Sequence, residues 1–104
     1  MYLFESGMVN NNLRGSKLEK EGDVDGAIQL YEYNVAHRFS GNHPYDRLSI
    51  IYRRQKRYED EVRVLEMAVD VFTNDVPDER PDKNKKLDKF KERLAKARSL
   101  IEAP

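Results

Sequence analysis

The stretch PYDRLSIIYRRQKRYEDEVRVLEMAVDVF, residues 44–72, decides the fold of this chain. Apolar residues on both sides of the charged corner at residues 55–57 recur mostly at intervals of three and four. This spacing places an apolar stripe along one side of an α-helix. Two such helices joined by a short polar corner predict an antiparallel helical hairpin whose stripes face each other. The first stripe is Tyr45, Leu48, Ile51 and Tyr52, and the second is Tyr58, Val62, Leu65, Val69 and Phe72.

The composition favours a small, heavily charged helical domain. The 104 residues are 38% apolar and 37% charged, which is enough for one domain with a modest core. The formal net charge is zero, so no overall field attracts the chain to nucleic acid or to a membrane. The chain has no cysteine, no secretion signal and no apolar run of about 18 residues that could span a membrane. We therefore expect no disulfide, no membrane contact and a cytoplasmic location.

A shorter apolar pattern precedes the central hairpin. Ser6-Gly7 predicts a break, and Asn10–Asn12 predicts the start of a helix that ends near Glu21, because asparagine side chains can accept hydrogen bonds from free backbone N–H groups. Gly15 lies inside this helix, where a glycine costs about 1 kcal/mol relative to alanine. Such a glycine indicates that another helix passes closely over the position of its missing side chain.

Glycine, aspartate and proline mark the ends of the next elements. Gly22 can adopt the left-handed conformation that closes a helix, and Asp23 can cap the helix that follows. Asn42 is expected to cap the third helix and Pro44 to lie in its first turn, whereas His43 is interpreted as a loop residue. The helix between these boundaries carries an apolar pattern of Val24, Ala27, Ile28, Tyr31 and Val35.

A loop and a final helix complete the chain. Residues 73–81 contain two prolines and no periodicity, which predicts a loop. We expect the last helix to run from about Asp82 to Ile101, with cations such as Lys83 covering its solvated sides. Its predicted apolar face is Leu87, Phe90, Leu94, Ala97 and Ile101.

The chain contains an internal repeat. When the corner Gly22-Asp23 is overlaid on the corner Lys56-Arg57, every aligned pair of residues is separated by 34 positions. Helix length, corner position and a small residue in the first helix, Gly15 or Ser49, all recur. The aligned pairs also include Leu18 with Tyr52, Val24 with Tyr58, Ile28 with Val62, Tyr31 with Leu65, and Val35 with Val69.

This period and pattern resemble the tetratricopeptide repeat (TPR), a helix–turn–helix unit of 34 residues. The resemblance covers about residues 8–75, and its best match is EGDVDGAIQLYE at residues 21–32. Gly15 and Ala27 occupy the family's small positions, where the two helices of a repeat approach closely. The chain departs from the family's preferences at Asn11 and Arg14, at Asn34 and Glu61, and at Phe39.

The resemblance implies an all-α fold in which antiparallel helical hairpins stack as a short right-handed TPR-like superhelix of about five helices. One domain is expected over residues 1–104, with repeat 1 at residues 8–41, repeat 2 at residues 42–75 and a capping helix at residues 82–103. Two repeats are fewer than the roughly three usually needed to bury a continuous core. The chain is therefore expected to belong to a longer protein, to pair with itself, or to take the missing contacts from the final helix and residues 1–4.

The resemblance also implies a non-enzymatic function in protein–protein interaction, because ligands of the family usually lie in a concave groove lined by the first helix of each repeat. Ile50 is an apolar residue within a polar stripe, so it can anchor a peptide while neighbouring arginines bind a carboxylate. The alternative is that Ile50 packs on a neighbouring helix and the arginines are solvated. The predicted partner-binding residues are Asn12, Ser16 and Glu19 in repeat 1, and Asp46, Ile50, Arg53 and Arg54 in repeat 2.

Catalysis and metal binding find little support in the residues. His37 and His43 are the only histidines, and the sequence contains no glycine-rich phosphate loop and no cluster with metal-ligand spacing. We therefore expect no catalytic residue, no metal and no cofactor. Some TPR proteins clamp the C-terminal carboxylate of chaperones with lysine and asparagine, but Asp46 and the other groove residues do not reproduce that clamp.

Two other kinds of partner remain as alternatives to a peptide. Basic segments alternate with the acidic residues of 59–79, which indicates charge complementarity as readily as nucleic-acid binding, so nucleic acid is not favoured. Exposed apolar surface at one end could instead join two copies of the chain, which would make it a self-associating assembly domain. The identity of a protein partner does not follow from the sequence.

Overall fold

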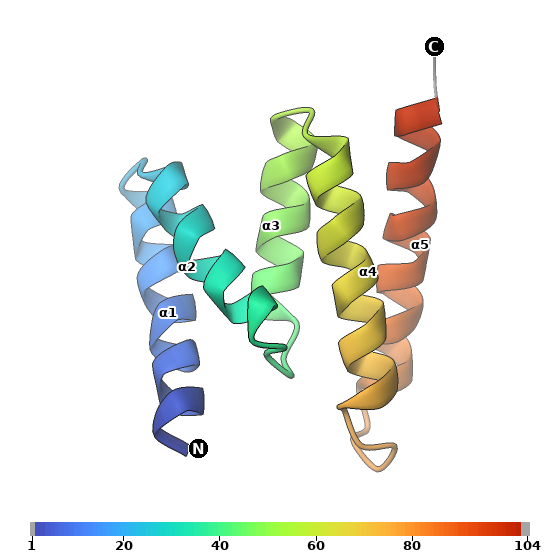
Figure 1. Cartoon of the computed structure of the whole chain (residues 1–104), viewed down its shortest axis with the longest axis horizontal. Helices are drawn as coiled ribbons and strands as arrows, with labels where there is room; N and C mark the ends of the chain where they lie inside the picture. The colour runs from blue at the N-terminus through green and yellow to red at the C-terminus, as the bar shows by residue number, and fades with distance from the viewer. Residues whose placement is uncertain (1, 103–104) are drawn as a thin grey trace.

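The computed structural model describes residues 2–102, with side chains from residue 7 onward. This part of the chain is all-helical, with five α-helices and no strand. Each helix packs against the next one along the chain, so the helices form a stack of helical hairpins, as predicted (Figure 1). The helices are α1 (Tyr2–Lys20), α2 (Val24–Ala36), α3 (His43–Arg54), α4 (Tyr58–Asn74) and α5 (Lys83–Glu102).

Helix α1 begins earlier than its residues suggest. The predicted break at Ser6-Gly7 and the predicted start at Asn10–Asn12 are both wrong, because α1 is continuous from Tyr2. Packing against α2 supports this part of the helix: Asn34 Nδ2 donates a hydrogen bond to the Met8 carbonyl oxygen at 2.8 Å. This contact offsets part of the cost of Gly7, since a glycine inside a helix is about 1 kcal/mol less favourable than an alanine. The expectation that residues 1–4 add core contacts concerns side chains that lie outside the described part of the structure.

The glycine in the middle of α1 has the packing reason that its position indicated. A Cβ atom added to Gly15 would lie 2.5 Å from Cε1 of Tyr31, so the Tyr31 ring occupies the space above this glycine. Tyr31 is fully buried on α2. The close approach of α1 and α2 therefore depends on a residue without a side chain at this position.

The two hairpin corners have the same backbone conformation. Gly22 has φ 88° and Lys56 has φ 59°, both in the left-handed region. The residues that follow, Asp23 and Arg57, have φ −90° and ψ 74°, and φ −92° and ψ 66°. In both corners the N–H of this following residue donates to the carbonyl five residues earlier at 2.8 Å. The two corners, which lie 34 residues apart in the sequence, therefore close their hairpins in the same way.

The side chain of Lys56 should cost stability, because a left-handed conformation is strained for residues other than glycine. We expect Lys56→Gly to raise the free energy of unfolding by about 0.5–1 kcal/mol in urea titrations. The matched change in the first corner, Gly22→Ala, should lower it by about 1 kcal/mol. A loss of stability in Lys56→Gly would show that the lysine side chain itself stabilises the corner.

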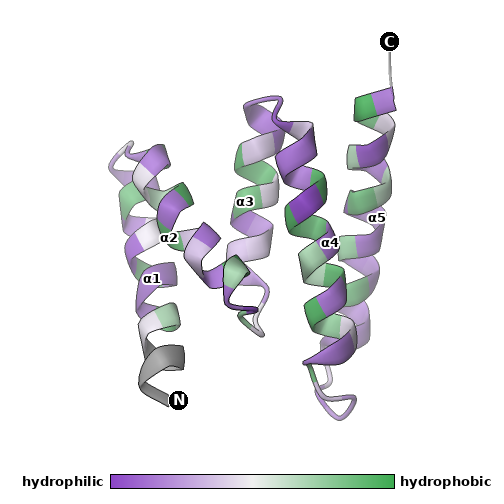
Figure 2. Cartoon of the chain, viewed as in Figure 1, coloured by the Kyte–Doolittle hydropathy of each residue, from purple (hydrophilic) through white to green (hydrophobic). Residues whose placement is uncertain are grey.

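The core is built mainly by α3, α4 and α5, together with one side of α2. Figure 2 shows hydrophobic bands on these helices separated by hydrophilic ones. The face predicted for α4 is partly wrong: Leu65 and Phe72 are buried, but Tyr58, Val62 and Val69 are only half-buried. Helix α4 packs against α3 on one side and α5 on the other, so it buries a wider and rotated face. The added buried residues of α4 are Glu61, Val64, Ala68 and Val71.

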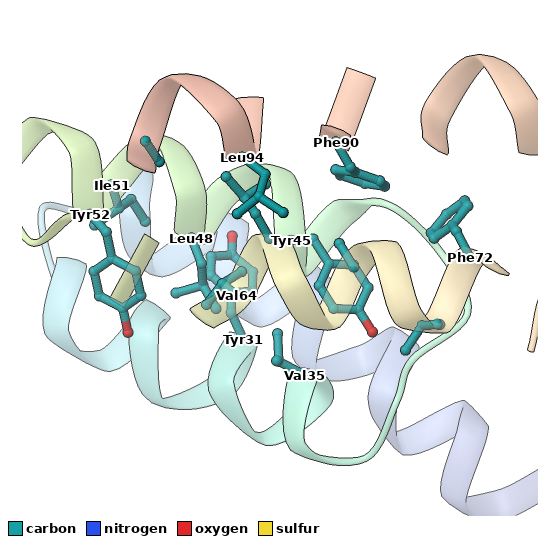
Figure 3. Packing of buried hydrophobic residues seen from close by; sticks show 14 of the residues in the cluster. Tyr31, Val35, Tyr45, Leu48, Ile51, Tyr52, Val64, Phe72, Phe90 and Leu94 are labelled. Atoms are coloured by element: carbon teal, nitrogen blue, oxygen red, sulfur yellow. The ribbon is translucent and has the colours of Figure 1, made fainter. Parts of the chain in front are cut away.

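Helix α5 packs into the core through one aromatic residue. The Phe90 ring meets the Phe72 ring edge-to-face at a centroid distance of 5.2 Å and the Tyr45 ring at 6.1 Å (Figure 3). Leu94 and Ala97 continue this buried face, as predicted. The prediction for Ile101 is wrong, because this residue is exposed in the last turn of α5.

Lys83, predicted to be solvated, is buried at the first residue of α5, against the segment that joins α4 to α5. Its Nζ donates to the carbonyl oxygens of Thr73 at 3.3 Å and Val76 at 2.8 Å, and it pairs with Asp78 at 2.7 Å. The last carbonyls of a helix lack intrahelical partners and carry partial negative charge. The Lys83 ammonium group therefore binds the free carbonyl oxygens at the end of α4 and does not need to be solvated.

Candidate functional site

Most of the predicted groove residues lie on one face of the stack, with α3 between α1 and α5 (Figure 1). Two ion pairs connect the three helices across this face. Arg47 of α3 pairs with Glu19 of α1 at 2.6 Å, and Arg93 of α5 pairs with Asp46 of α3 at 2.6 Å. We call this surface the α1–α3–α5 face. It contains several hollows, of which two are each lined by three of the predicted groove residues.

The first hollow, about 220 Å³ in volume, is lined in part by Ile50, and we call it the Ile50 hollow. Ile50 is half-buried, so it is neither a fully packed core residue nor a solvated one. Arg54, at the end of α3, is exposed and has no hydrogen bond or ion pair within the described residues. The residues that line the hollow are Ser49, Ile50, Arg53, Arg54, Glu61 and Arg93.

A buried carboxylate lies in the wall of the Ile50 hollow. Glu61 of α4 is 1% exposed, and its Oε2 accepts a hydrogen bond from Arg53 Nε at 2.8 Å and forms an ion pair with Arg53 Nη2 at 2.6 Å. Its other oxygen, Oε1, is buried and is the one such side-chain atom in the described residues without a hydrogen-bond partner. A buried charge needs a partner to offset its lost hydration. Arg53 supplies that partner through Oε2, whereas Oε1 is covered and its capacity to accept a hydrogen bond is unused within the described residues.

The second hollow, about 340 Å³ in volume, lies between α1 and α3 and is lined by Ser16, Glu19, Lys20, Arg47 and Arg54. Tyr31 OH donates to Glu19 Oε2 at 2.6 Å beneath it. Burial raises the pKa of Glu19, but the hydrogen bonds from Arg47 and Tyr31 outweigh it, and the pKa lies below its ordinary value. Burial and the bond to Glu19 raise the pKa of Tyr31 to about 12. This network keeps the tyrosine protonated and the carboxylate charged near neutral pH.

His43 was interpreted as a loop residue, and that interpretation is wrong. It is the first residue of α3, with Nε2 at 3.0 Å from Ser16 Oγ and its ring 5.5 Å from the Tyr31 ring, edge-on. Burial and the nearby Arg47 lower the pKa of His43 below its ordinary value of 6.5, against the opposing fields of Glu19 and Asp46. His43 therefore joins α1, α2 and α3 in its neutral form.

This arrangement predicts a pH-dependent stability. The unfolded chain binds a proton at His43 more readily than the folded chain, so stability is lost as the pH falls below 6.5 toward the lower folded-state pKa. We expect the free energy of unfolding to decrease between neutral and mildly acidic pH, above the window in which Glu19 titrates. In His43→Gln the same titration should be flatter. Equal slopes in the two proteins would contradict this assignment.

The structure brings together six of the seven predicted partner-binding residues on the α1–α3–α5 face. Asn12 is the exception: it is buried between α1 and α2, where its Oδ1 accepts a hydrogen bond from Asn34 Nδ2 at 2.8 Å. Asn42, the predicted cap of α3, makes no side-chain cap and instead donates to Asp46 Oδ2 at 2.6 Å. The six residues that line hollows of this face are Ser16, Glu19, Asp46, Ile50, Arg53 and Arg54.

Sequence reasoning missed the contribution of α5 to this face. Lys86, Lys89 and Arg93 line a smaller hollow of about 90 Å³ together with Asp46. The sequence did show a cationic stripe along the last helix, but we expected these side chains to face solvent and not a binding surface. The missed residue Glu61 had a signal too, because a carboxylate stands where the TPR pattern prefers alanine.

No protein-family model, curated protein or solved structure gives a significant match to the chain. No helix in the described part is both long and apolar enough to cross a membrane. The described residues contain no group of three or more histidine, aspartate or glutamate side chains arranged to hold a metal ion.

Proposed function

We propose that this chain is a non-enzymatic interaction domain that binds a segment of a partner protein on the α1–α3–α5 face. The observation that carries the proposal is the Ile50 hollow, in which an accessible apolar side chain lies beside an arginine without a partner in the described residues. Protein interfaces typically combine a buried apolar anchor with arginines that bind carboxylates. The resemblance to the tetratricopeptide repeat adds support, since that family binds its ligands on the corresponding helices.

The charge of the face favours an acidic segment. Its carboxylates are all engaged: Glu19, Asp46 and Glu61 each pair with an arginine. The cations Lys20, Arg54 and Lys89 line the same hollows and have no ion pair within the described residues. The face therefore carries excess positive charge although the chain as a whole is neutral. Such complementarity steers association and weakens at high salt.

Two single substitutions test this proposal. We expect Ile50→Asp and Arg54→Glu each to weaken the binding of an acidic peptide segment at least tenfold, or about 1.4 kcal/mol. The binders would be selected from an acidic peptide array and their affinities measured by fluorescence anisotropy. Helicity should stay unchanged, because Ile50 is half-buried and Arg54 is exposed.

Lys91→Glu, an equal charge reversal at an exposed position of α5 outside the hollows, is the matched control. Arg53 is not suitable for a binding test, because its loss would leave Glu61 buried and unpaired. Binders that tolerate both Ile50→Asp and Arg54→Glu would overturn the proposal, as would an array without any binder.

A second candidate function is self-association through α1. Leu13 is 66% exposed and Val9 is 46% exposed, one helical turn apart on the same side of α1. Light scattering across a dilution series separates the two candidates. A monomer at all concentrations supports the peptide-binding proposal, whereas a stable dimer that Leu13→Lys dissociates supports self-association. A dimer that covers Ile50 would contradict the peptide-binding proposal.

A further inference from the structure

We propose that the Ile50 hollow binds a tyrosine side chain of the acidic partner segment. This inference rests on the proposed function and specifies the residue that the partner inserts. It follows from the internal repeat, because the first repeat contains a tyrosine of its own in the corresponding place.

The contacts of Tyr31 define that place. The Tyr31 ring passes over Gly15, where an added Cβ would lie 2.5 Å from its Cε1. Its hydroxyl lies 3.5 Å from Ser16 Oγ and donates to Glu19 Oε2 at 2.6 Å. Three positions of α1 therefore surround the ring and its hydroxyl, and the tyrosine that fills this space comes from α2.

The same three positions in the second repeat line the Ile50 hollow. Adding 34 to Gly15, Ser16 and Glu19 leads to Ser49, Ile50 and Arg53, all of which contact the hollow. The residue equivalent to Tyr31 is Leu65, which is shorter than tyrosine and does not line the hollow. The second repeat thus leaves open the space that the first repeat fills with an aromatic ring. Its volume of about 220 Å³ exceeds the roughly 150 Å³ of an apolar cavity that accepts a benzene ring.

The wall of the hollow supplies an acceptor for the phenol hydroxyl. In the first repeat the hydroxyl bonds to Glu19, a carboxylate that Arg47 also binds. In the second repeat Arg53 occupies the carboxylate position and pairs with Glu61, whose Oε1 has no partner within the described residues. Glu61 is aligned with Ala27, so this carboxylate is an addition of the second repeat. A ring bearing a hydroxyl can satisfy Oε1, whereas phenylalanine cannot.

Entry of the ring requires only local side-chain movement. Oε1 of Glu61 is covered in the unbound chain, and Arg53, which is 36% exposed, is the flexible residue bound to the same carboxylate. A joint movement of Glu61 and Arg53 that keeps their ion pair would bring Oε1 to the hollow while Ile50 packs against the ring. Arg54 and Arg93 at the same hollow can lie against the ring faces and the acidic flanks of the segment.

The test uses three fluorescein-labelled peptides of alternating aspartate and glutamate with a central tyrosine, phenylalanine or alanine. By anisotropy at low salt, we expect the tyrosine peptide to bind at least about tenfold more tightly than the alanine peptide, and several-fold more tightly than the phenylalanine peptide. Ile50→Asp should erase the difference among the peptides.

A double variant fills the hollow from inside. Ser49→Gly with Leu65→Tyr introduces the glycine and the tyrosine of the first repeat, so the internal ring should exclude the external one. We expect this variant to bind the tyrosine and alanine peptides equally well, with binding of both abolished by a further Arg54→Glu. Circular dichroism checks its fold, and if it does not fold, the Ile50→Asp result decides the same question.

The outcomes separate this inference from the function on which it rests. Equal binding of the tyrosine and alanine peptides by the wild-type chain would overturn the tyrosine site and leave an acidic-segment interface in place. Tyrosine preference that survives Ile50→Asp would also overturn it, because the ring would then lie elsewhere. Absence of binding by all three peptides would overturn the tyrosine site, and the peptide array tests the general proposal independently.

Discussion

Phe90→Ala is expected to lower the free energy of unfolding by about 3–5 kcal/mol, as for other buried phenylalanines truncated to alanine. Phe90 is 1% exposed and is the sole aromatic residue of α5. Its ring contacts those of Phe72 on α4 and Tyr45 on α3, so it joins three helices at one point (Figure 3). A loss of this size is a large part of the roughly 5–15 kcal/mol that stabilises a typical domain. Urea unfolding followed by circular dichroism measures it.

Lys91→Ala, next to Phe90 on the exposed side of α5, is the control and should change stability by less than about 0.5 kcal/mol. If Phe90→Ala were as stable as this control, α5 would be a detachable cover and not part of the core. A separate early transition confined to α5 would lead to the same conclusion. The prediction therefore tests whether α5 is part of the core or only covers the end of the helical stack.

Arg53→Ala is expected to cost about 3 kcal/mol, because it leaves the Glu61 carboxylate buried without its counter-charge. The cost comes from the unpaired charge and not from lost arginine packing. Removing both charges in Arg53→Ala with Glu61→Ala should therefore restore much of the stability. The aligned residue of the first repeat is already alanine, Ala27, so this position in the repeat accommodates the smaller side chain.

Arg54→Ala provides the comparison for Arg53→Ala. It removes the same side chain one position further along α3, where it is exposed and has no ion pair in the described residues, so we expect a change within about 0.5 kcal/mol. The double-mutant cycle between Arg53 and Glu61 should give a coupling of more than about 1 kcal/mol. Additive effects would show that the buried carboxylate does not depend on Arg53.

The features that sequence reasoning predicted correctly are those set by neighbouring residues along the chain. The left-handed corner at Gly22, the Asp23 cap and the apolar stripe of α3 each depend on a few adjacent positions. The comparison of the two 34-residue segments adds one prediction that local residues do not give, namely that Lys56 forms a corner like that of Gly22. Gly15 predicted a close neighbour, and that neighbour is Tyr31.

Three polar or charged residues whose places sequence reasoning missed share a different cause. His43, Lys83 and Glu61 carry polar or charged side chains that would be solvated in an isolated helix. Each is instead held by groups distant in the chain or in another element, such as Ser16 for His43 and the end of α4 for Lys83. Local patterns cannot supply such partners, since they do not say which helix packs beside which.

The sequence by itself determined five helices, their corners, the 34-residue repeat and the stripe that carries Ile50, because backbone conformation and amphipathic periodicity depend on local residue types. Only the tertiary structure decided that α5 adds cations to the α1–α3–α5 face, that Asn12 lies apart from it, and that a hollow lies beside Ile50. The reason is that charge pairing and empty volume arise between helices. Both depend on how side chains from separate segments meet, and no single helix contains that information.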